Sequence, residues 1–252
     1  MDLGLRDRVF VVTGGSRGLG FATAQVLVAE GARVVLSARD GDGVTRATTA
    51  LGTEAAAGLA ADNADPGTAQ RLAGLAQERF GRLDGGLISV GGPPGGTVAE
   101  STDEQWRAAF ESVFLGAVRL ARVLGETVGE GGSIAFLLSS SVRSPIPSLA
   151  ISNGLRPGLA GVAKSLADEL GPAGIRVNGL LPGKMDTDRV RWLDARSGDP
   201  ERVKVENSRQ IPLRRYGEPA EFGRVAAFIL SPAASYVTGA MIRVDGGAIR
   251  SI

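Results

Sequence analysis

The 252-residue chain contains no cysteine and no histidine. It therefore cannot build a metal site from thiolates and imidazoles, use a thiol nucleophile, or assemble a catalytic triad that needs histidine. Aromatic residues are also scarce at 5%, and only two of them are tyrosines. Any acid–base chemistry must rest mainly on hydroxyl, carboxylate, ammonium or guanidinium groups.

The chain also lacks a charge bias and long hydrophobic runs. Its 28 Lys and Arg residues against 27 Asp and Glu residues leave a net charge of +1, which gives no sign of a nucleic-acid or membrane partner. No apolar run approaches the roughly 18 residues of a membrane-spanning helix, and the N-terminus has no signal-peptide pattern. We expect a soluble, cytoplasmic protein that acts on a small molecule.

Glycine, by contrast, is abundant, and one glycine-rich stretch organises the chain. Residues 13–20 read TGGSRGLG and lie between the apolar run 9–12 and a helical pattern. Gly14, Gly18 and Gly20 allow a sharp turn, close approach to a pyrophosphate, and close packing of helix on strand. The helix N-terminus adds free N–H groups for an anion. This stretch predicts a dinucleotide-phosphate site, and a tight turn without a ligand is the alternative.

A cation at the end of the second apolar run, residues 33–39, bears on which dinucleotide binds. An acidic residue at that position would bond the ribose 2′-hydroxyl of NAD, whereas an arginine accommodates the 2′-phosphate of NADP. The chain has Arg39 there, and Arg17 in the glycine turn can approach the same phosphate. We therefore favour NADP(H) over NAD(H), with two solvated surface arginines as the alternative.

The remaining pattern alternates strands with helices. Further strands are expected at residues 58–63, 83–90, 133–138, 175–180 and 241–244, and helices at 66–80, 102–126 and 152–170. This alternation predicts one Rossmann-like α/β domain over residues 1–252, with a doubly wound, seven-stranded parallel sheet and helices on both faces.

Several loops follow these strands at the edge where ligands bind. Asp62 either bonds an adenine amino group, with Asn63 beside it, or forms an Asx turn or helix N-cap. Gly91 begins a glycine- and proline-rich loop next to the first strand, either at the ligand site or as a simple connection. The charged segment 186–215 is interpreted as a lid, with a solvated amphipathic helix pair as the alternative.

Over nearly its whole length the chain resembles the short-chain dehydrogenases/reductases, especially the members similar to 3-oxoacyl-carrier-protein reductases. Residues 13–20 resemble the family's TGxxxGxG motif, residues 174–178 and 182–187 its nicotinamide-binding strand and PGxxxT loop, and residues 237–239 and 244–247 its C-terminal signature. The resemblance implies a homotetramer built through helices 102–126 and 152–170. The cofactor-binding residues, from motif and pattern together, are Gly14, Ser16, Arg17, Gly18, Leu19, Gly20, Arg39, Asp62, Asn63, Gly91, Pro182, Gly183, Met185 and Thr187.

The catalytic positions depart from that family. Its active site is a tetrad of Asn, Ser, Tyr and Lys, in which tyrosine protonates the carbonyl oxygen and lysine lowers the tyrosine pKa and holds the ribose. Here the serine position is Ser139, but Ser152 and Arg156 align with tyrosine and lysine, and Val113 with asparagine. The family's NNAG segment is replaced by residues 89–92, Ser-Val-Gly-Gly. A serine hydroxyl is far less acidic than a phenol, and a guanidinium is a poor proton donor.

Two functions fit these residues. The first is an atypical NADP(H)-dependent oxidoreductase acting on a carbonyl or alcohol, with Ser139, Ser152 and Arg156 as its catalytic candidates and a proton that arrives through water, Lys184 or Asp186. The second is a redox-silent protein that binds nucleotide for structure or sensing, or performs dehydration or cyclisation. Non-catalytic alternatives are a strand-end hydroxyl for Ser139, a helix N-cap for Ser152 and a surface charge for Arg156. A pure scaffold is the least favoured function.

Overall fold

In the computed structural model, which describes residues 2–196 and 198–251, seven parallel strands form one sheet in the order β3-β2-β1-β4-β5-β6-β7. The strands are β1 Val9–Thr13, β2 Arg33–Ala38, β3 Ala56–Ala60, β4 Gly85–Ser89, β5 Ser133–Leu137, β6 Arg176–Pro182 and β7 Met241–Val244. The strand order reverses between β1 and β4, and ligands of such sheets bind at that reversal, beyond the carboxyl ends of the strands.

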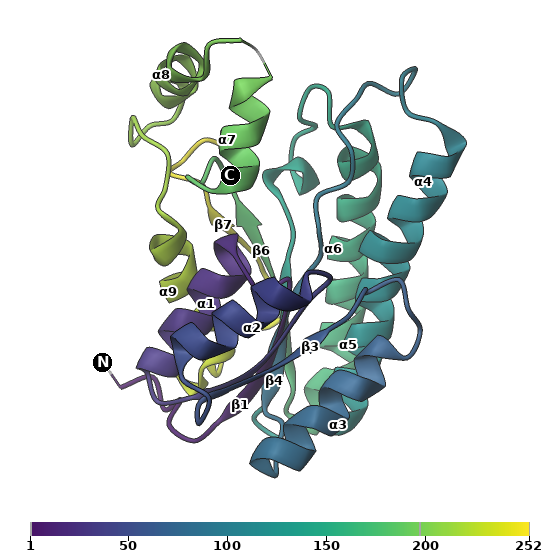
Figure 1. Ribbon diagram of the computed structural model, residues 1–252, viewed down its shortest axis with the longest axis vertical. Coiled ribbons are helices and arrows are strands. Elements are labelled where there is room, and N and C mark those ends of the chain that lie inside the picture. The colour runs from purple at the N-terminus through teal and green to yellow at the C-terminus, as the bar shows by residue number, and fades with distance from the viewer. Residues whose placement is uncertain (1, 197, 252) are drawn as a thin grey trace.

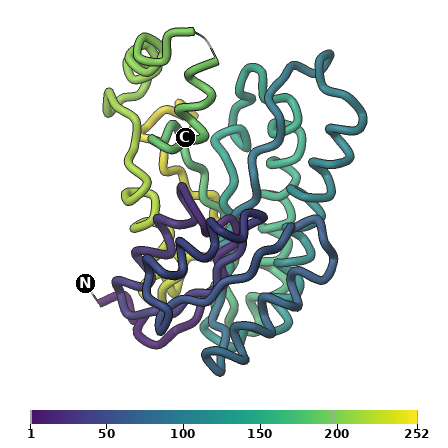
Figure 2. Tube along the Cα trace, viewed as in Figure 1, coloured from purple at the N-terminus to yellow at the C-terminus, as the bar shows by residue number. Residues whose placement is uncertain are grey.

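Helices cover both faces of the sheet (Figure 1). They are α1 Gly18–Ala29, α2 Gly41–Leu51, α3 Thr68–Phe80, α4 Asp103–Ala109, α5 Gly116–Thr127, α6 Ala150–Leu170, α7 Asp188–Ala195, α8 Pro200–Gln210 and α9 Pro219–Leu230. Helices α3, α4, α5 and α6 lie together on one side, and α1, α2 and α9 lie on the other (Figures 1 and 2). The expected doubly wound, single-domain α/β fold is therefore confirmed.

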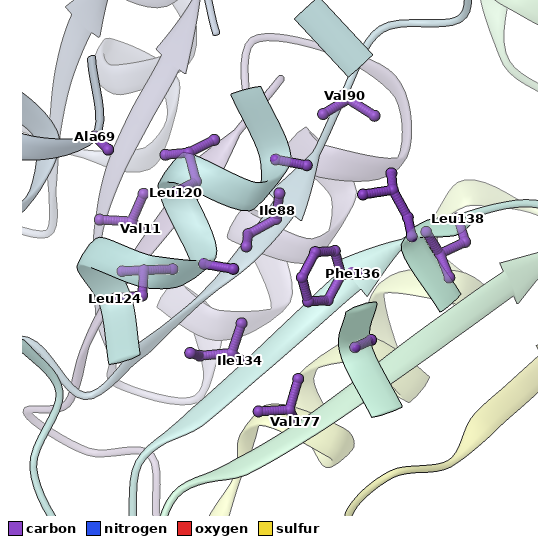
Figure 3. Close-up of a cluster of buried hydrophobic side chains, with 14 of the residues drawn as sticks. Val11, Ala69, Ile88, Val90, Leu120, Leu124, Ile134, Phe136, Leu138 and Val177 are labelled. Carbon is purple, nitrogen blue, oxygen red and sulfur yellow. The ribbon is translucent and has the colours of Figure 1, made fainter. Parts of the chain in front are cut away.

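Alternate strand residues build two hydrophobic cores, one under each helical layer, because successive side chains of a strand point to opposite faces. Val11, Ile88, Ile134 and Phe136 point toward the α3–α6 layer and pack with α5 residues such as Leu120 (Figure 3). Their neighbours along the same strands join α1 and α9 in the second core. Every residue of β1, β4 and β5 is buried, which explains their nearly continuous apolar sequences.

The element boundaries correct several expectations. The third strand, β3, occupies 56–60 rather than 58–63, so that Asp62 and Asn63 follow it in a turn. The long helix expected at 102–126 contains a π-helical segment, Phe110–Leu115, between α4 and α5. Helices α2 and α9 were not expected from the sequence.

The start of α6 also differs from the expectation, with a consequence for Ser152. The helix begins at Ala150 with Leu149 at its N-cap, because the preceding loop is held by a bridge between Gly96 and Leu149. Ser152 therefore lies inside the first helical turn and is buried. Its interpretation as an N-cap is wrong.

The charged segment 186–215 forms two short helices, α7 and α8, that lie beyond one end of the sheet (Figure 1). Both have strongly polar sequences, and α8 has no buried residue. The segment thus has the form of the helix pair that was the alternative to a lid. Among the described residues, no helix combines the length and apolarity needed to cross a bilayer.

Candidate functional site

The glycine turn between β1 and α1 has the geometry of a phosphate-binding loop. Gly14 and Gly18 both have φ of +59°, a conformation that L side chains rarely adopt. A Cβ on Gly20 would lie 2.4 Å from the Gly14 carbonyl oxygen. Helix α1 therefore approaches the turn more closely than a residue other than glycine at position 20 would allow. The helix N-terminus consequently faces the turn with its free N–H groups.

Backbone and hydroxyl hydrogen bonds fix this turn to the neighbouring strands. The Thr13 hydroxyl donates to the Ser89 carbonyl at 2.8 Å and accepts from the Ser89 N–H at 2.9 Å. The Gly15 N–H donates to the Ser37 carbonyl at 3.0 Å. The start of the loop after β4, which includes Gly91, therefore lies beside the glycine turn, as the sequence predicted.

Arg17 and Arg39, the residues expected to recognise a 2′-phosphate, are both exposed. Neither forms an ion pair with any described residue. Ser16 and Leu19 lie in the same turn and are partly exposed. The glycine turn and the carboxyl end of β2 thus each offer one guanidinium group that is available to an anion.

Asp62 forms the Asx turn that was one of its expected roles. Its Oδ1 accepts a hydrogen bond from the Ala64 N–H at 3.0 Å, while the N-cap of α3 is Gly67. The N-cap interpretation of Asp62 is therefore wrong. The Asn63 carbonyl lies against α5, where a Cβ on Gly116 would lie 2.4 Å from it. The turn that carries both residues is therefore packed closely against the start of α5.

The loop after β6 brings the remaining cofactor candidates to the same place. Gly183, which follows Pro182, donates its N–H to the Val244 carbonyl at 3.0 Å, and Met185 is buried. Thr187 caps α7, and its methyl carbon lies 3.9 Å from the position a Cβ on Gly18 would take. The PGxxxT loop therefore faces the glycine turn, so the two motifs form one continuous site.

The catalytic candidates Ser139 and Ser152 lie at the carboxyl end of β5 and at the start of α6. Ser139 Oγ accepts a hydrogen bond from the Ser141 N–H at 3.1 Å. Ser152 is only 5% exposed, and its hydroxyl makes no hydrogen bond within the described chain, which leaves it available to a ligand. The fully buried hydroxyl that lacks a partner among the described residues is that of Ser141.

Arg156 is buried and does not lie on the helix surface, so the surface-charge interpretation is wrong. Its Nη1 donates to the Leu137 and Leu138 carbonyls at 3.0 and 2.9 Å, which draws the guanidinium to the end of β5. Burial lowers the pKa of Arg156 to about 10, and the charge of Arg189 contributes. The side chain remains protonated at neutral pH and keeps Nε and Nη2 without a protein acceptor among the described residues.

Lys184 and Asp186, expected as possible proton donors, are engaged elsewhere. Asp186 accepts hydrogen bonds from Arg191 at 2.5 Å and from Lys204 at 2.8 Å, and the bond from Lys204 is the main cause of its lowered pKa. An ionised carboxylate cannot donate a proton. Lys184 Nζ lies 3.6 Å from Asp194 Oδ1. Both residues thus stabilise the 186–215 segment.

The two tyrosines do not replace the missing phenol either. Tyr236 is fully exposed, at 103%. Tyr216 donates its hydroxyl to Asp194 Oδ2 at 2.9 Å and accepts from Asn207 at 2.8 Å. Burial raises the pKa of Tyr216 to about 12, so that its proton is held more firmly than in water.

At the asparagine position, Val113 lies within the π-helical segment and is buried in the core. The site as a whole therefore pairs the glycine turn and the PGxxxT loop with a second half that holds the catalytic candidates Ser139, Ser152 and Arg156. No sequence pattern pointed to one further residue, Arg189, whose guanidinium lies at the loop after β4.

Comparisons with known proteins agree with this geometry. A family model described as Enoyl-(Acyl carrier protein) reductase matches residues 14–248. The 3-oxoacyl-[acyl-carrier-protein] reductase MabA of Mycobacterium tuberculosis is 31% identical, with 96% of this chain and 92% of the relative covered.

Two solved structures extend the comparison to the fold. A short-chain dehydrogenase/reductase (glucose/ribitol dehydrogenase) from Brucella melitensis has a TM-score of 0.93 and 31% identity, with all of both chains covered. An NADPH-bound short-chain oxidoreductase from Pseudomonas aeruginosa PAO1, described as containing an atypical catalytic center, has a TM-score of 0.89 and 30% identity, with 97% and 98% covered.

Proposed function

The chain belongs to the short-chain dehydrogenase/reductase family and is similar to its 3-oxoacyl-carrier-protein reductases, and we propose that it is an NADP(H)-dependent oxidoreductase that interconverts a carbonyl compound and an alcohol. The observation that carries this proposal is the intact nucleotide-binding half, in which the glycine turn and the PGxxxT loop face each other. The NADPH-bound Pseudomonas neighbour with its atypical center supports both the cofactor and the departure from the usual tetrad.

The residues present fit a dinucleotide. Gly14 and Gly18 have positive φ angles, and only the Thr187 methyl carbon, at 3.9 Å, lies near the Cβ position of Gly18, which leaves the backbone of the turn open to a pyrophosphate. Arg17 and Arg39 have no ion-pair partner in the described chain and suit the 2′-phosphate that distinguishes NADP from NAD. Asp62 and Asn63 lie where an adenine would be bound, and Thr187 and Arg156 lie toward the nicotinamide end.

The chemistry of the catalytic half follows from its donors. The bound nicotinamide supplies a hydride to the carbonyl carbon, or accepts one in the reverse direction. The Ser139 and Ser152 hydroxyls donate hydrogen bonds to the substrate oxygen as negative charge develops there. Ser152 then gives its proton to that oxygen and takes one from a water molecule, so that one hydride and one proton complete the reduction. Arg156 places a fixed positive charge beside this step and donates to the ribose hydroxyls.

The first test compares turnover with binding. Wild-type protein should oxidise NADPH with at least one member of a broad carbonyl panel. Ser152→Ala should lower kcat about 10²-fold, the usual cost of removing one donor to a developing oxyanion, with an unchanged Kd for NADPH. Ser235→Ala is the matched control because Ser235 is exposed and lies outside the site. Absence of turnover over carbonyl and alcohol panels, despite NADPH binding, would contradict the redox proposal.

A redox-silent role is the second candidate, and the replacement of the tyrosine and lysine positions by Ser152 and Arg156 favours it. It predicts that wild-type protein binds NADPH without turnover, and that Ser152→Tyr combined with Arg156→Lys creates reductase activity. Activity already present in the wild type would exclude it.

A further inference from the structure

Arg189, in the first turn of α7, is fixed at the mouth of the catalytic half. Its Nη2 donates to the Pro93 carbonyl at 2.9 Å, and a Cβ on Gly92 would lie 3.2 Å from its Nε. Both contacts belong to the loop that follows β4, directly beyond Ser89. The guanidinium is thus held at the end of the strand where the site opens, although the residue as a whole is exposed to solvent.

An aromatic ring orients this guanidinium. The Arg189 guanidinium carbon lies 4.9 Å from the Trp192 ring centre, and that of Arg196 lies 5.3 Å from the same ring. Stacking on an indole restricts a guanidinium and leaves its N–H groups directed outward from its edge. Arginine held in this way is suited to bidentate binding of a carboxylate.

A second cation lies close by. Arg156 is bound to the carbonyls at the end of β5, and Leu137 of β5 is the register partner of Ser89 of β4. The two guanidinium groups therefore occupy the ends of adjacent strands, and the charge of Arg189 contributes to the lowered pKa of Arg156. Like charges placed together in this way repel each other unless an anion lies between them.

The described chain supplies no such anion. Neither Arg156 nor Arg189 makes an ion pair there, whereas the nearby carboxylates already have partners. Asp186 is bound by Arg191 and Lys204. Glu100 accepts from the Thr97 N–H and hydroxyl at 2.8 and 2.9 Å. The positive charge of the site is thus left for a ligand to balance.

From this arrangement we infer that the substrate is an oxo acid or hydroxy acid whose carboxylate is bound by Arg189, within the positive potential of Arg156. The inference rests on the proposed function, because it names the substrate class for the same site. The carboxylate takes no part in bond making, and Arg189 positions the substrate so that its carbonyl oxygen reaches the Ser139 and Ser152 hydroxyls.

Matched pairs of an acid and its neutral ester test the inference by calorimetry. The probes are acetoacetate with methyl acetoacetate, and phenylglyoxylate with methyl phenylglyoxylate, each titrated with and without saturating NADP⁺. Wild-type protein should bind at least one acid tenfold or more tightly than its ester. Arg189→Gln should abolish that preference, whereas Arg202→Gln, on α8 and paired with Glu206, should retain it.

Three results would overturn the inference. The first is equal or absent binding of the acid and the ester in both pairs. The second is a preference for the acid that survives in Arg189→Gln. The third is a loss of NADP⁺ affinity in Arg189→Gln while the affinity for the acids is unchanged. The last would place Arg189 in the cofactor site. Titration of NADPH into the same protein reports on the proposed function separately. NADPH binding can fail while the preference for acids persists, and the preference for acids can fail while NADPH still binds.

Discussion

At the scale of single residues, the proposed site has groups that do not titrate near neutral pH where its relatives have a phenol and an ammonium. In the proposed mechanism the Ser152 hydroxyl acts by hydrogen bonding and proton relay, and Arg156 acts as a constant charge. A tyrosine assisted by lysine would instead lose its proton within the working range of such enzymes. The pH dependence of turnover therefore distinguishes this site from the usual tetrad.

We predict that kcat is flat between pH 6 and 9. Arginine is charged below its pKa, and burial lowers that of Arg156 to about 10, so activity should fall only as the pH rises through that value. The measurement is the pH profile of kcat with the best substrate found. Arg156→Lys should move the decline to lower pH, because a buried ammonium starts from a lower pKa than a guanidinium. An inflection between pH 6 and 9 in the wild type would contradict the assignment.

The sequence predicted these residues unequally. The glycine turn follows from local pattern alone, because the conformation of Gly14 and Gly18 is set by neighbours in the chain. The burial of Arg156 does not follow from the local pattern, because its hydrogen-bond acceptors are carbonyls 18 and 19 residues away in the chain. Of the two interpretations of Ser152, the N-cap was wrong because α6 begins at Ala150, earlier than the local sequence indicates, after a loop in which Gly96 bridges to Leu149.

At the scale of elements, the turn between β1 and α1 depends on close approach. In Gly20→Ala the new Cβ would overlap the Gly14 carbonyl oxygen, which lies 2.4 Å from its position. We predict a loss of about 1–3 kcal/mol of unfolding free energy and a more than tenfold weaker Kd for NADPH. Chemical denaturation and calorimetry measure the two quantities.

Gly74→Ala in α3 is the matched control, because nothing lies within 4 Å of its Cβ position. Alanine should stabilise that helix by about 0.5–1 kcal/mol and leave NADPH binding unchanged. Similar NADPH affinity in Gly20→Ala and wild type would show that the turn does not hold the pyrophosphate.

Tyr216 links the two helices of the α7–α8 segment, because its hydroxyl donates to Asp194 and accepts from Asn207. Tyr216→Phe removes both hydrogen bonds, including the one at 2.9 Å to the buried Asp194 carboxylate. We expect a cost of about 1–3 kcal/mol and faster amide hydrogen exchange confined to residues 186–215. Tyr236→Phe, at an exposed position, is the control and should change neither quantity. Unchanged exchange in Tyr216→Phe would mean that other contacts hold the segment.

The elements themselves were predictable to different degrees. The strands of the sheet centre were found because buried parallel strands have continuous apolar sequences, as in Val9–Thr13. Helix α2 was missed because Gly41, Gly43 and its threonines oppose helix formation, and its stability comes from packing on β2 and β3. Whether α7 and α8 act as a lid remains a proposal, which the hydrogen-exchange experiment also addresses.

At the scale of the whole molecule, the alternation of strands and helices was enough to predict the layers and the ligand edge. The outer face of the α3–α6 layer carries an exposed aromatic side chain. Phe110 is 44% exposed and stacks on Phe114 with ring centres 5.3 Å apart. Phe110 lies between α4 and α5, within the region through which the family resemblance implies a homotetramer.

We therefore predict a homotetramer that uses α4, α5 and α6. Phe110→Ser should shift the assembly toward smaller species, measured by light scattering at several protein concentrations. Tyr236→Ser, which removes an exposed aromatic side chain elsewhere on the surface, serves as the comparison. A wild-type monomer at all concentrations would exclude the tetramer.

We propose that this chain retains the nucleotide-binding half of the family's site and has rebuilt the catalytic half. Calorimetric titration with NADPH and, in parallel, with NADH tests this proposal. We predict clear binding with a preference for NADPH. Arg17→Gln or Arg39→Gln should lower the NADPH affinity about tenfold, because each removes one charged hydrogen bond. Arg107→Gln, on α4, should leave that affinity unchanged. Failure to bind either nucleotide would mean that the glycine turn serves folding alone, and would contradict the oxidoreductase account.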